Sequence, residues 1–208
     1  IFKSRSDNKL NQRACFSALQ KFIFYGPEFI QKTTLTNEQI AALTSEELLQ
    51  AVRDLYAKKH DVLYYGPSDE AMAKKMIAEH HKISENPEPL ERIHPQARQV
   101  ASSEVFIAPY DANQFYYLQY SNRGEKLNAA NDPEARMYNS YFGNGMGAIV
   151  FQEMREARGL AYSASAYLGD LGYKDCDYIF YAFIASQNDK AKEAVEAFDS
   201  IINDMPES

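Results

Sequence analysis

The chain has 208 residues, 45% of them hydrophobic, which is enough to build a substantial core in one large or two small domains. Its formal charge of −7 argues against nucleic acid as the main partner, because phosphate binding needs a positive surface. No apolar run is long enough to cross a bilayer, so we expect no transmembrane segment.

The first 81 residues show helical periodicity with one short apolar run between helices. We expect helices at 11–24, 43–60 and 68–81 and a buried strand at 61–65. In the second helix Thr44 and Glu47 have the spacing of a capping box. This helix has an apolar stripe, which we expect to face a core, made of Leu48, Leu49, Val52, Leu55 and Tyr56.

A proline-containing stretch at 84–99, without apolar periodicity, then predicts a mobile linker with a domain boundary near Arg98. Beyond it the pattern predicts strands at 103–109, 114–121, 160–168 and 178–186 and helices at 132–142, 149–159 and 188–205. Adjacent strands with short links and grouped helices are typical of an α+β fold. We therefore expect a mostly antiparallel sheet with helices packed on one face.

Several familiar catalytic and metal-binding patterns are absent from the sequence. The cluster GNGMG follows a helix and lacks the lysine of a phosphate-binding loop, so it is read as a tight turn between helices. Glu79 and His80 resemble the end of the zinc motif H-x-x-E-H, but Met76 occupies the position of the first histidine. Cys15 and Cys176 are far apart and are read as independent thiols. We therefore expect no catalytic residue and no metal ligand in this chain.

The segment REARGLAYS, residues 155–163, allows two interpretations. In the plainer one, Arg155 belongs to a solvated helix end and Tyr162 is a strand residue that fills the core. In the functional one, Gly159 reverses the chain, so that Tyr162 returns to the side of Arg155. A guanidinium and a phenol would then offer fixed donors to a carbonyl oxygen or an oxyanion.

The stretch YFGNGMGAIVFQEMREARGLAYSASA, residues 141–166, resembles the signature of the insulinase-type, or pitrilysin-type, zinc metallopeptidases, which include the mitochondrial processing peptidase. Its usual form is L-x-x-x-L-R-E-x-x-G-L-x-Y after a glycine cluster and before a strand. Asn144 replaces the more usual glycine in the middle of that cluster, and we expect it to tolerate a left-handed conformation. Residues 43–70 are similar to the closing helix–strand–helix of the preceding domain in such proteins.

The resemblance implies a particular place for this chain in a larger peptidase. Homologous α+β domains of that family are paired around a closed chamber, with zinc bound by H-x-x-E-H in one domain. The opposite domain contributes an arginine and a tyrosine seven residues apart, and Arg155 and Tyr162 match this pair as substrate-binding residues. Residues 1–92 would then be the closing half of one domain and residues 98–208 the opening half of the next, non-zinc domain.

On this reading the chain is the non-catalytic, substrate-embracing part of a zinc metalloendopeptidase. Zinc and its H-x-x-E-H motif would come from another domain of the full-length protein or from a partner subunit, and the peptide substrate would lie between them. The chain alone is expected to be inactive. The alternative is a non-enzymatic scaffold or interaction protein that retains the fold. The compartment stays open, and a signal peptide in the full-length protein would direct it to the periplasm or another extracytoplasmic space.

Overall fold

A computed structural model describes residues 1–208 except 82–83, 91–94, 127, 129, 173–174 and 205–208. The chain forms two compact units, one of Ile1–Thr34 with Pro95–Ser208 and the other of Leu35–His94. The first 34 residues therefore belong to the same unit as the C-terminal half of the chain. The assignment of 1–92 and 98–208 to two homologous domains remains a prediction.

The larger unit is built on an antiparallel sheet of β1 (Gln114–Ser121), β2 (Ser163–Gly169) and β3 (Ile179–Gln187) in the order β1-β3-β2. The expected α+β fold with an antiparallel sheet is confirmed. Successive side chains of β3 point to opposite faces, as the pleat of a strand requires. Ala182 and Ile184 enter the main core on one face, and Tyr181 faces the other.

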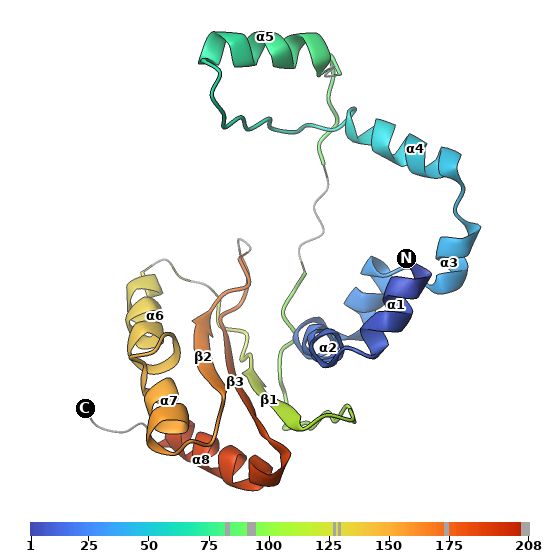
Figure 1. Ribbon diagram of the computed structural model, residues 1–208. Helices are drawn as coiled ribbons and strands as arrows, with labels where there is room; N and C mark the ends of the chain where they lie inside the picture. The colour runs from blue at the N-terminus through green and yellow to red at the C-terminus, as the bar shows by residue number, and fades with distance from the viewer. Residues whose placement is uncertain (82–83, 91–94, 127, 129, 173–174, 205–208) are drawn as a thin grey trace. The chain divides into compact units, whose positions relative to one another are not determined.

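Helices cover the first face of this sheet (Figure 1). They are α6 (Asp132–Tyr138), the π-helix η1 (Asn139–Gly143), α7 (Ile149–Phe151), the π-helix η2 (Gln152–Ala157), the 3-10 helix η3 (Asn188–Lys190) and α8 (Ala191–Asn203). Phe142, Val150, Met154 and Phe198 are fully buried between these helices and the sheet. Burial of large apolar side chains stabilises such a layer by about 1.5–3 kcal/mol each.

A further helix, α2 (Gln12–Thr33), packs on the opposite face of the sheet, after the short α1 (Phe2–Lys9). The ring of Phe16 lies 5.3 Å from the ring of Phe183, and the ring of Phe24 stacks on Tyr120 at 4.8 Å between centroids. The sheet therefore has helices on both faces, whereas the sequence indicated helices on one face. The aromatic residues of β1 and β3 that point away from the main core explain this second layer.

Helix α2 also extends beyond its predicted end before Gly26. Gly26 has φ 75° and ψ 175°, which breaks the helix, and the helical conformation resumes from Pro27 to Thr33. Proline is well suited to this restart because its fixed φ fits the first turn, where its missing N–H costs nothing. The Gly-Pro pair thus produces a kink and not a termination.

The predicted strand at 103–109 is not present. Its residues form no ladder, and the side chains of Val105 and Ile107 are each 84% exposed. An alternating apolar pattern is compatible with a strand, but strand formation also needs a neighbouring edge to supply hydrogen bonds. That requirement is not met for this segment.

The smaller unit contains α3 (Asn37–Ala42), α4 (Ser45–Leu55) and α5 (Glu70–His80). The capping box at Thr44 and Glu47 is present as predicted: each donates a backbone N–H to the other's side chain. The predicted buried strand at 61–65 is wrong, since these residues form no ladder and the Leu63 side chain is 95% exposed. The apolar stripe of α4 is likewise exposed and not buried against a core.

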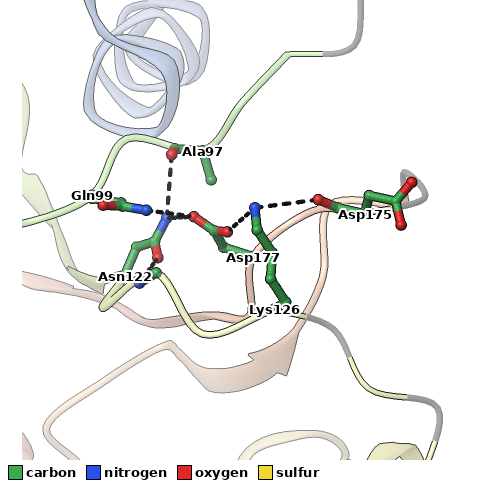
Figure 2. Close-up of polar contacts among 7 residues, drawn as sticks. Ala97, Gln99, Asn122, Lys126, Asp175 and Asp177 are labelled. Atoms are coloured by element: carbon green, nitrogen blue, oxygen red, sulfur yellow. Dashed lines mark hydrogen bonds and ion pairs between the residues drawn. The ribbon is translucent and has the colours of Figure 1, made fainter.

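A polar cluster around the buried Asp177 and Asn122 connects three loops at one end of the sheet in the larger unit (Figure 2). The carboxylate of Asp177, which is 3% exposed, accepts hydrogen bonds from Lys126 Nζ at 2.6 Å and from the side-chain amides of Gln99 and Asn122 at 3.2 Å. Asn122 also donates to the carbonyl of Ala97 at 3.2 Å. The hydrogen bond from Lys126 is the main reason that the pKa of Asp177 lies below its usual value.

We predict that Asp177→Ala lowers the free energy of unfolding by about 1–3 kcal/mol, because two amide donors lose their acceptor. A carboxylate with a lowered pKa stabilises the fold above its unfolded pKa, and this stabilisation is lost as pH falls through the folded pKa. Urea unfolding of both proteins between pH 7 and pH 3 should therefore show the difference shrinking on acidification. Asp175→Asn is the matched control, since only the backbone carbonyl of Asp175 contacts Lys126. A constant difference across this pH range would contradict the prediction.

Candidate functional site

The candidate site lies where the π-helix η2 ends and the chain reverses into β2. Gly159 has φ 59°, a left-handed conformation that a glycine adopts at little cost. Its N–H donates to the carbonyl of Arg155 at 3.1 Å, and the N–H groups of Leu160 and Ala161 both donate to the carbonyl of Met154. The helix end is therefore closed by local hydrogen bonds.

The end of β3 and the helix that follows it hold this turn from the other side. The backbone N–H of Tyr162 donates to the carbonyl of Ala185 at 2.8 Å, and the Ser186 hydroxyl donates to the carbonyl of Leu160. Lys190 Nζ donates to the carbonyl of Gly159 at 3.2 Å. The backbone between Arg155 and Tyr162 is thus fixed by contacts on both sides.

The reversal brings the side chains of Arg155 and Tyr162 together. Cζ of Arg155 lies 5.8 Å from the centroid of the Tyr162 ring and 5.0 Å from that of the Phe151 ring, both within the range of cation–π interactions. The side chain of Tyr162 is 73% exposed, so the interpretation of Tyr162 as a core residue is wrong. The chain reversal at Gly159 therefore brings the two side chains close together, as the functional interpretation predicted.

Both residues are accessible to solvent: Tyr162 is 73% exposed and the side chain of Arg155 is 46% exposed. Among the residues that the structure describes, neither the guanidinium of Arg155 nor the hydroxyl of Tyr162 makes a hydrogen bond to another group. The nearest acidic group to Arg155 is Glu156, with 3.7 Å between Nε and Oε1. Both side chains of this ion pair are about half exposed, so the pair contributes little. The two tips are available as hydrogen-bond donors to a ligand.

The glycine cluster at 143–147 positions the helices that carry the site. A Cβ atom at Gly143 would lie 2.1 Å from the carbonyl oxygen of Ala166, so only glycine allows η1 to pack this closely on β2. Asn139 adds two hydrogen bonds to the backbone of Leu168, at 2.7 and 2.8 Å. Asn144 is extended, with φ −130°, and the positive φ falls on Gly145 instead. The expected left-handed conformation at Asn144 is therefore not required.

Possible metal ligands are sparse in the described part of the chain. It contains no group of three or more His, Cys, Asp or Glu side chains arranged to hold a metal ion. The nearest approach is a pair of exposed imidazoles in the smaller unit, with 2.6 Å between Nε2 of His60 and Nε2 of His81. His94 lies outside the described residues. The donor set that is described does not fit a structural or catalytic zinc site, which uses at least three protein ligands.

A cavity of about 1160 Å³ lies beside β1. It is lined by residues of α2, the 98–125 region, the start of β3 and α8, with single residues of α6, β2 and η3, but by neither Arg155 nor Tyr162. We assign the site to the Arg155–Tyr162 surface because two adjacent donor side chains there make no hydrogen bond within the described part of the chain. That surface is open to water, and a ligand bound there would need a second facing surface to exclude solvent.

Sequence reasoning missed three residues that complete this arrangement. Phe151 stacks on Arg155, and Ser186 and Lys190 hold the turn. The spacing of Phe151, four residues before Arg155 in a helical segment, was a usable signal, because residues four apart are neighbours on a helix surface. Ser186 and Lys190 carry no such signal, since the tertiary fold brings the end of β3 and η3 to the turn.

Residues 42–207 match the model of the family described as the peptidase M16 inactive domain. The chain therefore belongs to this family of non-catalytic, peptidase-like domains, and its resemblance to the insulinase-type peptidases is confirmed. No curated protein matches the chain.

Two solved structures are similar to this chain. A crystal structure of a peptidase M16 inactive domain from Pseudomonas fluorescens has a TM-score of 0.62 and 17% identity over 97% of this chain and 49% of its own. A protease from Helicobacter pylori has a TM-score of 0.46 and 12% identity over 83% of this chain and 43% of its own. At this identity the first similarity supports the fold alone. The chain spans about half the length of the Pseudomonas protein.

Within the described residues, no helix has both the length and the apolar character needed to cross a membrane.

We predict that Gly143→Ala lowers the free energy of unfolding by about 1–3 kcal/mol or more, because the new methyl group would collide with the backbone of β2. Gly147→Ala is the matched control, since an added Cβ there meets nothing within 4 Å and its φ is not positive. Urea unfolding followed by circular dichroism measures both. Equal stability of the two variants would show that the close contact of η1 with β2 does not exist.

We also predict that purified residues 1–208 bind no stoichiometric zinc, given the sparse donor set described above. Elemental analysis after dialysis against metal-free buffer is the measurement. A His60→Ala variant separates weak capture by the exposed imidazole pair from a genuine site. About one tightly held zinc per chain in both proteins would contradict the prediction.

Proposed function

We propose that this chain is the substrate-embracing, non-catalytic part of a zinc-dependent metalloendopeptidase that cleaves peptides within a closed chamber. Another domain or chain supplies the zinc site. The observation that carries the proposal is the pairing of Arg155 with Tyr162, whose polar tips are exposed on a turn fixed from both sides. Membership of the peptidase M16 inactive domain family supports the peptidase context.

The chemistry of the pair suits a peptide carbonyl. Arginine stays charged and presents N–H donors from a planar group, and the phenol adds an O–H donor of adjustable direction. Together they would bind the carbonyl oxygen near the scissile bond and stabilise the negative charge that develops on it during attack by water. They would orient and polarise the substrate, while activation of the water belongs to the domain that holds the zinc.

The exposure of Arg155 and Tyr162 is compatible with a binding site that is completed when the surface of a second domain covers it. Electrostatic donors of this kind are most effective where water is excluded and the local dielectric is low. A facing domain would bury the exposed Tyr162 ring and the Arg155 edge together with the bound peptide. The proposal therefore places the substrate between this chain and the zinc-bearing partner.

We predict that Arg155→Ala and Tyr162→Phe each lower kcat/KM for peptide cleavage by the full-length, assembled peptidase. Loss of one oxyanion-type donor typically costs about 2.7–4 kcal/mol, or roughly a hundred- to a thousandfold in rate. Zinc content should not change, and neither should the fold, since neither substitution empties a core.

Two neighbouring residues provide matched controls. Arg158→Ala removes a guanidinium from the same helix end, where it contacts only Glu153 at 3.5 Å. Tyr141→Phe removes the hydroxyl of another exposed tyrosine. Both controls should keep kcat/KM near the wild-type value. Wild-type turnover in Arg155→Ala and Tyr162→Phe would refute the proposal and favour a non-enzymatic scaffold that retains the peptidase fold.

A further inference from the structure

We infer that Phe151 is a positioning residue, which holds the guanidinium of Arg155 by stacking and so presents its N–H edge to the substrate carbonyl. The inference rests on the proposed function and adds a residue to it. Cζ of Arg155 lies 5.0 Å from the centroid of the Phe151 ring, closer than the 5.8 Å to the Tyr162 ring. Phe151 thus makes the shorter of the two ring contacts to the candidate donor.

Phe151 and Arg155 lie in consecutive helical segments, four residues apart, so their side chains are neighbours on the helix surface. Phe151 is the last residue of α7 and is half-buried, with the fully buried Val150 and Met154 on either side of it in sequence. Arg155 follows within η2, where the wider turn of a π-helix replaces the α-helical one. Such π-turns are rare and occur frequently at functional sites. Phe151 is therefore half-buried, while the side chain of Arg155 that stacks on its ring is 46% exposed.

Stacking leaves the hydrogen-bonding capacity of Arg155 intact. The N–H groups of a guanidinium lie in its plane, whereas a cation–π contact uses its face. A ring contact can therefore fix the orientation of this long side chain without engaging its donors. It also removes rotamer freedom before the substrate arrives, so less conformational entropy is lost on binding.

A second arginine of the same unit shows the contrasting case. Cζ of Arg98 lies 5.5 Å from the centroid of the Phe106 ring, but its guanidinium is also paired with the carboxylate of Glu104. There the stacked guanidinium has a fixed acidic partner and a structural role. At Arg155 the stacking is similar, but the ion pair with Glu156 is long, with 3.7 Å between Nε and Oε1, and among the described residues the guanidinium makes no hydrogen bond. Arg98 is therefore engaged by a close acidic partner, whereas Arg155 has only a weak, exposed ion pair that a ligand could replace.

The inference is tested by Phe151→Leu and Phe151→Tyr, with Phe106→Leu as the matched control that removes the other cation–π contact. In the full-length peptidase, Phe151→Leu should lower kcat/KM by about two- to fivefold, the range expected for an exposed cation–π contact. Phe151→Tyr keeps an aromatic ring and should retain the wild-type value, and so should Phe106→Leu. Circular dichroism checks that each variant is folded.

A double-mutant cycle with Arg155→Ala shows whether Phe151 acts through the arginine. The variant carrying both Phe151→Leu and Arg155→Ala should be no slower than Arg155→Ala alone. If the two effects multiply instead, Phe151 acts by another route and the inference is overturned.

A measurement that is independent of activity completes the test. In ¹⁵N spectra of residues 1–208, the Nε–H signal of Arg155 should shift in Phe151→Leu and stay close to its wild-type position in Phe151→Tyr and Phe106→Leu. An unchanged signal in Phe151→Leu overturns the stacking itself. If Arg155→Ala leaves kcat/KM unaltered while the signal does shift, the proposed function fails, although Phe151 still orients the side chain.

Discussion

Strand β3 carries hydrogen bonds along both edges, to β1 on one side and β2 on the other, and the larger unit is organised around it. Its alternating side chains enter the main core on one face and meet the aromatic residues of α2 on the other. Because a one-residue shift would exchange these faces, the register of β3 is fixed by both layers at once. Ser186 near the end of β3 and Lys190 of η3 then hold the Gly159 turn. The position of the candidate site thus follows from the pairing of the central strand.

The site combines a rigid backbone with exposed donors. Local closure of the π-helix, the left-handed Gly159 and three contacts from the end of β3 and its continuation determine where Arg155 and Tyr162 lie. The ring of the half-buried Phe151 stacks on the guanidinium. A binding group gains most from such an arrangement when its orientation is fixed before the ligand arrives. Open donors on a fixed turn are suited to a surface that a second domain covers.

In the smaller unit, the helix caps follow from residues close together in the sequence, whereas burial and strand pairing do not. The capping box at Thr44 and Glu47 and the N-cap at Asp69 are present because each involves groups within three residues of one another. The apolar stripe of α4 gives the helix its periodicity but does not specify a partner, and the stripe is exposed. The predicted strand at 61–65 failed for the related reason that an apolar run needs an adjacent strand to become part of a sheet.

The sequence by itself determined the α+β class, most of the helices, the capping box at Thr44, the three strands that pair and the spacing that returns Tyr162 to Arg155 across Gly159. These features depend on periodicity and on backbone preferences that act over a few residues. The tertiary structure decided the strand order, the packing of α2 on the second face of the sheet and the absence of a strand at 103–109. It also decided the contacts of Ser186 and Lys190 with the turn. Those outcomes depend on groups distant in sequence, whose meeting is fixed only when the whole sheet forms.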